Sequence, residues 1–215
     1  MDDKALRQAV IDELDFEPSI DAAEIGVMAE RGVITLTGHV RSYTEKLTAE
    51  EVAKRVKGVK ALAMEIEIRH PTARKTADDE IARRAVDLLD WNVSIPSERI
   101  QVEVEHGWLT LTGDVDWHYQ KQMAENAVRQ LADIAGVTNL ITIRPTTASA
   151  DVKVEIDNAL KRNGELRADD IRVSVENGRV TLEGEVKLPS DRGIAERIAW
   201  AVRGVDEVDD RLKVA

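Results

Sequence analysis

The stretch Ile25-Gly-Val-Met-Ala-Glu-Arg-Gly-Val-Ile-Thr-Leu-Thr-Gly-His-Val40 is the most informative part of this 215-residue chain. Its pattern returns at residues 100–115 and again at 171–186, first 75 and then 71 residues further on. Eight of the sixteen positions are identical in all three copies. Self-similarity at a nearly constant period is the signature of tandem structural units. The sequence therefore predicts three copies of one small module.

The repeated stretch has the pattern of a β-hairpin. In its second half, Ile34 and Leu36 alternate with Val33 and Thr35, as expected of a strand with one apolar and one mostly polar face. The two strands are separated by a pair of residues of the form X-Gly. Such a pair predicts a tight hairpin turn, because glycine accepts the positive φ that this turn requires. These pairs are Arg31-Gly32, His106-Gly107 and Asn177-Gly178. Turn formation and close backbone packing explain the repeated glycines better than phosphate binding does.

Amphipathic helices are predicted on both sides of each hairpin. The helix before it has apolar residues at helical spacing: Leu6, Val10 and Leu14, then Ile81, Ala85 and Leu89, then Ile156 and Leu160. The helix after it has a similar stripe, which includes Ala49, Val52 and Ala53 in the first copy. A last apolar segment, with Ile66 and Ile68 in the first copy, completes each module as a third strand.

The predicted fold class is α+β, with three tandem αββαβ modules. Each module is expected to be a three-stranded mixed sheet with two helices on one face, because the strands are apolar on one side only. We place modules 1, 2 and 3 at residues 1–70, 77–145 and 150–215. The linkers between them, 70–76 and 145–150, each contain a proline among small or polar residues.

Charge and composition limit the classes of partner and location. The net charge is −11 and every module is acidic, which disfavours attraction to nucleic acid or anionic lipid. The chain has no cysteine, so disulfides and thiolate metal sites are excluded. Its first residues lack the basic and apolar segments of a secretory signal, and no apolar run is long enough to span a bilayer. We expect a cytoplasmic protein, or a periplasmic one if the chain is a processed form.

No combination of residues predicts an enzyme active site. The four histidines are scattered, and phosphate-binding loops and nucleophile motifs are absent from the sequence. Pairs of neighbouring acids are the remaining candidates for cation binding: Asp2-Asp3, Asp78-Asp79, Asp169-Asp170 and Asp209-Asp210. Two of these pairs begin helices, where negative charge complements the helix dipole, and structural roles explain them better. We expect no catalysis, no cofactor, no metal and no small-molecule substrate.

An aromatic cluster in module 2 is the first candidate interaction surface. Strand alternation puts Trp108 on the polar sheet face, where the other copies have Val33 and Arg179. Exposed aromatic rings are typical anchors for protein partners. Packing against a neighbouring module is the alternative explanation. The candidate residues are Trp91, Trp108, Trp117 and Tyr119.

A basic run at the end of the second helix of module 1 is the second candidate surface. It consists of Lys54, Arg55, Lys57 and Lys60. These cations form a candidate patch for weak binding to anionic lipid. The alternative is a solvated face, because cations also complement the C-terminus of a helix.

The repeated pattern resembles the BON domain, named for bacterial OsmY and nodulation proteins. The resemblance is carried by Ile-x-Val-x-Val-x-x-Gly-x-Val-Thr-Leu-x-Gly-x-Val and by a following helix that ends in Gly-Val-x-x-Val, seen at residues 204–208. It covers nearly the whole chain. Segments 40–46 and 115–120 are similar to those of OsmY-like soluble bacterial proteins with three BON domains.

The resemblance implies a binding module without catalysis. BON domains are associated with osmotic and general stress proteins and with attachment to phospholipid. We therefore expect a stress-response protein that acts through a protein partner, self-association or chaperone-like contacts. The alternative is a phospholipid- or envelope-associating protein. The third copy departs from the pattern at Leu188-Pro189-Ser190, and its first helix and loop are expected to be four residues shorter.

Overall fold

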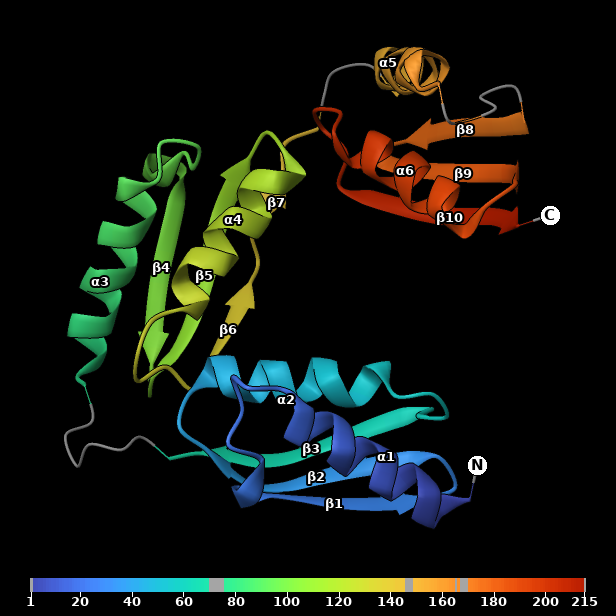
Figure 1. Ribbon diagram of the computed structural model, residues 1–215. Coiled ribbons are helices and arrows are strands. Elements are labelled where there is room, and N and C mark those ends of the chain that lie inside the picture. The colour runs from blue at the N-terminus through green and yellow to red at the C-terminus, as the bar shows by residue number, and fades with distance from the viewer. Residues whose placement is uncertain (1, 70–75, 146–148, 165, 167–169, 215) are drawn as a thin grey trace. The chain divides into compact units, whose positions relative to one another are not determined.

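The computed structural model describes residues 2–69, 76–145, 149–164, 166 and 170–214 (Figure 1). Residues 70–75 of the first predicted linker, residues 146–148 of the second, and Asp169 of one acidic pair lie outside these residues. Close packing of Cα atoms divides the chain into two compact units. One contains Met1–Ala85, Glu103–Leu109 and Val128–Thr138, and the other contains the remaining residues, so module 2 contributes to both.

The described elements repeat in the order helix, strand, strand, helix, strand (Figure 1). Module 1 contains α1 (Asp3–Phe16), β1 (Ile25–Glu30), β2 (Val33–Val40), α2 (Tyr43–Arg55) and β3 (Ala61–Ile68). Module 2 contains α3 (Asp78–Trp91), β4 (Ile100–Glu105), β5 (Trp108–Val115), α4 (His118–Arg129), β6 (Gly136–Asn139) and β7 (Thr142–Ile143). Module 3 contains α5 (Ser149–Arg162), β8 (Ile171–Glu176), β9 (Arg179–Val186), α6 (Pro189–Trp200) and β10 (Glu207–Val214). Short 3₁₀ turns, η1 (Ala22–Glu24) and η2 (Ser97–Arg99), precede β1 and β4.

Three separate mixed sheets confirm the predicted α+β class. In module 1 the strand order is β1-β2-β3, with β1 antiparallel and β3 parallel to β2. Module 3 has the same arrangement, in the order β8-β9-β10. In module 2 the third strand is interrupted at residues 140–141, and its two parts, β6 and β7, both pair with β5.

Both helices of a module cover the same face of its sheet (Figure 1). The predicted helix stripes are buried, and so are the inward residues of the strands. In module 1 the core includes Leu6, Val10, Ile34, Leu36 and Val52. Module 3 has an equivalent aliphatic core. Since one face is covered, the opposite face of each sheet is left for other roles.

The hairpin turns have the predicted conformation. Arg31 and Gly32 have φ values of 51° and 85°, and the turns of the other two modules match them. In module 1, Asp3 at the start of α1 accepts hydrogen bonds from the backbone N–H groups of both turn residues, at 2.9 and 3.3 Å. Asp78 does the same for His106 and Gly107, at 2.7 and 2.9 Å. These acids therefore join the first helix to the hairpin.

At the start of the second helix, a side chain accepts a backbone hydrogen bond in all three modules, although the sequences differ. Ser42 caps α2 by accepting from the backbone N–H of Glu45 at 3.1 Å. Gln120 accepts from the N–H groups of residues 116 and 117, both at 3.2 Å. Asp191, buried at the same position of module 3, accepts from Leu188 N–H at 3.1 Å. The N-terminus of α6, where the sequence departs from the other two modules, thus still has a side-chain acceptor for a backbone N–H group.

The expected shortening of the first helix and loop in module 3 is wrong. Helices α1, α3 and α5 each have 14 residues. From the end of each first helix to the next strand, the spacing is also the same in all three modules. The four missing residues therefore belong to the linker that precedes α5.

Candidate interaction surfaces

Each sheet has a face that the helices leave uncovered, which we call the open face. On β2, Ile34, Leu36 and Val40 are buried, whereas Val33 is exposed and Thr35 is half-buried on the opposite side. The same alternation occurs on β5 and β9. The three open faces are therefore equivalent surfaces built on one backbone pattern.

Trp108 lies on the open face of module 2 and is held there by its own sheet. Its indole Nε1 donates a hydrogen bond to Thr138 Oγ1 on β6 at 2.8 Å. Its ring lies against Gly136, where an added Cβ would come within 2.5 Å of the ring. The side chain nevertheless remains 48% exposed. The result is a positioned aromatic surface in which one ring face is supported and the rest meets solvent.

The sheet position equivalent to Trp108 holds a different type of side chain in each of the other modules. In module 1, Val33 pairs with Ala61, and Met28 on the neighbouring strand is exposed. In module 3, Arg179 pairs with Glu207, and their side chains form an ion pair with a 2.6 Å N–O distance. At this one position of the sheet, the open face therefore has an apolar pair in module 1, an aromatic ring in module 2 and an ion pair in module 3.

The open face of module 1 continues into a groove beside strand β1. The groove has a volume of about 720 Å³, and Met28 and Val33 are among its lining residues. Arg7 of α1 closes part of the β1 edge, because its Nε donates to the Val27 carbonyl at 2.8 Å. In this module the free edge of the sheet is thus partly occupied by the protein's own side chain.

The open face of module 3 has two rows of alternating charge. One row runs across the sheet through Glu207, Arg179 and Glu176, which are neighbours in the strand register. The other row contains Arg211, Glu183 and Arg172 in the same way. Opposite charges that face each other across strands stabilise a sheet and discriminate between partners.

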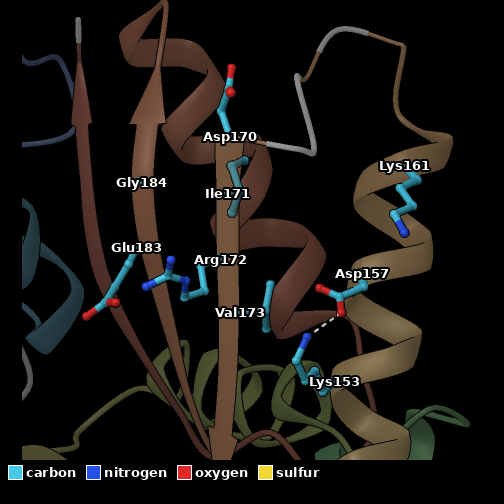
Figure 2. Close-up of a pocket in the computed structure, with 9 residues that line it drawn as sticks. All are labelled: Lys153, Asp157, Lys161, Asp170, Ile171, Arg172, Val173, Glu183 and Gly184. Atoms are coloured by element: carbon cyan, nitrogen blue, oxygen red, sulfur yellow. Dashed lines mark hydrogen bonds and ion pairs between the residues drawn. The ribbon is translucent and has the colours of Figure 1, made fainter.

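A groove of about 650 Å³ lies between α5 and the edge strand β8 of module 3 (Figure 2). On the helix side, Lys153 and Asp157 form an ion pair and point toward the strand, and Lys161 lies one turn further along. Arg172 and Glu183 lie on the other side of β8 from this helix (Figure 2). The groove is thus lined by charges of both signs.

The remaining aromatic candidates occupy two positions. Trp117 and Tyr119, at the start of α4, have ring centroids 6.3 Å apart. Between them in sequence, His118 stacks on Trp200 of α6, which belongs to the same compact unit, with centroids 3.7 Å apart. Burial lowers the pKa of the His118 imidazole. Trp91, the last residue of α3, is 89% exposed.

Two of the four cations in the candidate basic patch are paired with acids. Lys54 forms an ion pair with Glu50 on the same helix. Arg55 forms one with Glu13 of α1, at 3.6 Å. Lys57 and Lys60 are exposed. The patch therefore offers less free positive charge than its sequence suggests, which limits its attraction for anionic lipid.

Three of the four acidic pairs have structural partners. Asp2 caps α1 through Ala5 N–H, and Asp79 pairs with Arg83. Asp209 pairs with Arg211, and Asp210 with Arg192. Among the described residues, no cluster of His, Cys, Asp or Glu could hold a metal ion. No helix in the described ranges is long and apolar enough to cross a bilayer.

This arrangement defines a class of proteins, namely tandem αββαβ modules whose sheets have one open face. The BON domain matches the chain at residues 2–70, 77–145 and 148–215. Because these matches span almost all of the sequence, the chain belongs to the BON domain family. It is similar to osmotically-inducible protein Y of Escherichia coli (strain K12), with 28% identity over 144 residues. That alignment covers 65% of this chain and 71% of the relative.

Two solved structures have only distant similarity. CdsD, a structural protein of the type III secretion system of Chlamydia trachomatis, is 16% identical with a TM-score of 0.28, covering 98% of this chain and 92% of CdsD. The periplasmic domain of PrgH from S. typhimurium, a type III secretion inner-membrane protein, is 12% identical with a TM-score of 0.23. The latter match covers 95% of this chain and 99% of the PrgH fragment. Similarities at this level carry no argument about function.

The charge rows of module 3 are the main surface that the sequence analysis did not single out. Their signal is present in the sequence, since Arg172, Glu176, Arg179 and Glu183 occupy the polar positions of two adjacent strands. Recognising the rows also requires the register of β10, which is separated from the hairpin by a helix. The support of Trp108 by Gly136 was missed for the same reason.

Proposed function

We propose that this chain is a non-enzymatic scaffold of the bacterial osmotic or general stress response, and that it acts by binding other proteins. Membership of the BON family and similarity to an osmotically inducible protein support the stress-related part. The exposed ring of Trp108, held in place by Thr138 and Gly136, supports the binding part. A ring positioned in this way loses little conformational freedom when a partner covers it.

A Trp108→Val variant tests the proposal, because valine is the residue that module 1 has at this position. Wild type and variant are used to capture proteins from lysate of osmotically stressed cells, and the affinity for each captured protein is then measured. We expect the variant to bind at least about 2 kcal/mol more weakly, as at interaction hot spots, with little change in the free energy of unfolding. Unchanged affinity combined with a lower melting temperature would show that the ring only supports the fold.

A phospholipid- or envelope-associating protein is the second candidate function, favoured by the exposed cations Lys57 and Lys60. The net charge of −11 opposes approach to an anionic surface, so binding should be weak and sensitive to salt. Flotation with vesicles of neutral and anionic lipid, at low and physiological salt, separates the alternatives. Tight binding to neutral vesicles at physiological salt would contradict the electrostatic argument and favour the envelope function.

We further propose a cytoplasmic location for the scaffold. The acidic charge of every module and the absence of cysteine are compatible with that compartment. Fractionation of the native cells with an antibody against the chain tests the location. Recovery in the periplasmic fraction would contradict it.

A further inference from the structure

Strand β8 of module 3 has a free edge. It pairs with β9 on one side, and the groove beside α5 lies on the other. In module 1, the equivalent strand exposes its Val27 carbonyl at this edge, where it accepts the hydrogen bond from Arg7. The residue that corresponds to Val27 is Val173, and the residue that corresponds to Arg7 is Lys153. Lys153 pairs with Asp157 instead, and among the described residues no side chain forms a hydrogen bond with the backbone of Val173 at this edge.

The charges at the β8 edge are also available. Arg172 and Glu176 end the two charge rows of the open face. Within the part of the chain that the structure describes, neither side chain forms an ion pair. A strand added beside β8 would continue the alternation only if it placed an acid next to Arg172 and a base next to Glu176.

The sequence of β8 satisfies this requirement when it is paired with itself. In an antiparallel pair centred on Ser174, Arg172 faces Glu176 of the second copy, and Glu176 faces its Arg172. Val173 then faces Val175, so backbone groups at the free edge meet one another as an antiparallel ladder requires. We propose that β8 is a self-association edge, through which two copies of this chain join their module 3 sheets into one. This goes beyond the proposed partner binding at Trp108 and uses a different module.

The equivalent edges of modules 1 and 2 are not self-complementary. On β1 the open-face residues are Gly26, Met28 and Glu30, and Arg7 occupies the edge. On β4 the middle open-face residue is Glu103, which would meet its own copy across the axis. Like charges directly opposite each other destabilise a strand pair. Self-association is therefore specific to module 3.

Charge reversal at the two ends of β8 tests the proposal in the full-length chain. We expect wild type to form a reversible dimer in sedimentation velocity as the concentration rises. In a dimer of the Arg172→Glu variant, an acid would face an acid at both ends of the strand pair. In a dimer of the Glu176→Arg variant, a base would face a base at both ends. Each variant alone should therefore be monomeric. An equimolar mixture restores both attractive pairs and should form a heterodimer. Since the two variants change the net charge in opposite directions, a general charge effect cannot produce this pattern.

The matched control is Glu30→Arg, which makes the same reversal at the equivalent position of β1 and should leave the dimer unchanged. Circular dichroism establishes that each variant is folded. A wild type that remains monomeric at millimolar concentration, or a mixture that remains monomeric, would overturn the proposal. So would charge variants that dimerise as wild type does. None of these outcomes bears on binding at Trp108, which is measured separately.

A disulfide trap provides a second test that does not alter the charges. The chain has no cysteine, so Ser174→Cys introduces a single thiol, placed next to its own copy at the centre of the pair. Opposed residues in an antiparallel sheet have Cα distances that a disulfide can bridge. Mild oxidation should yield a covalent dimer. The control, Met28→Cys at the equivalent position of β1, should cross-link far less, and equal cross-linking of the two would contradict the proposal.

Discussion

The repeated glycine near the end of each hairpin shows how strongly a single residue can constrain this fold. Gly184 has a φ of 133°, and an added Cβ would lie 2.0 Å from the carbonyl oxygen of Asp170. Gly38 and Gly113 meet the backbone in the same way in the other modules. Both the positive φ and the lack of space exclude a side chain. Three independent copies therefore retain glycine for one steric reason.

We predict that Gly184→Ala destabilises the protein by more than about 3 kcal/mol, because it combines backbone strain with a steric clash. Gly193→Ala is the matched control in the same module, since Gly193 lies within α6 and has open space around it. Alanine in a helix is favoured over glycine by roughly 0.5–1 kcal/mol, so the control should be stabilised slightly. Urea unfolding measures both. Equal effects of the two substitutions would contradict the steric explanation.

At this scale the sequence predicts buried residues well and surface contacts poorly. The burial of Leu6, Val10 and Ile34 follows from the spacing of apolar residues alone. The position of Trp108 on the open face also follows from strand alternation. Its partner Thr138, thirty positions away, does not, because hydrogen bonds between distant side chains depend on strand register.

At the scale of elements, one aspartate joins the first helix to the hairpin. Asp78 accepts two backbone hydrogen bonds from the turn residues His106 and Gly107. The sequence identifies this residue only as an acid that complements the helix dipole. Its second role depends on the turn folding back onto the start of α3, which no local pattern indicates.

We predict that Asp78→Ala costs about 1–2 kcal/mol of stability, because it leaves two turn N–H groups without their charged acceptor. Asp79→Ala is a stringent control, since the neighbouring acid has the same charge and the same place in the helix. Among the described residues, Asp79 makes an exposed ion pair with Arg83 and no other, so its loss should cost about 0.5 kcal/mol or less. Thermal unfolding of both variants measures the two losses of stability. Equal losses would show that Asp78 stabilises the protein through the helix dipole alone and not through the turn N–H groups.

The length of α5 could not be predicted from the spacing of the repeats. The offset between modules falls from 75 to 71 residues, which can be accommodated in a helix, a loop or a linker. The structure keeps all 14 residues of α5, because its stripe of Val152, Ile156 and Leu160 is needed to cover the sheet. The linker before α5 has no such packing requirement, so it can be shorter without removing buried residues from the core.

At the scale of the whole molecule, the chain is three similar cores with three different open faces. The cores of modules 1 and 3 use corresponding aliphatic residues. The open faces instead have an apolar pair, a supported ring and rows of charge. Conserved interiors with divergent exteriors are what we expect of a scaffold whose modules contact different surfaces.

The boundaries 1–70, 77–145 and 150–215 remain a prediction, and we propose that each segment is an independent domain. The continuous core of module 3, which includes Ile156, Leu182 and Leu212, supports this for the last segment. A fragment of residues 148–215 should then unfold cooperatively, with the same heat of unfolding per residue as other small domains. Calorimetry of the fragment provides the check, and a broad transition without a heat-absorption peak would show that the module needs its neighbours.

The most direct test of the scaffold account is hydroxyl-radical footprinting of the full-length chain, alone and with a protein captured from stressed cells. Trp108 is about half exposed and Trp91 almost fully exposed, so both rings should be oxidised readily in the free chain. We predict that the partner protects Trp108 strongly while Trp91 of the same module stays reactive. Equal oxidation of Trp108 with and without the bound partner would contradict the central claim that the open face of module 2 is the binding surface.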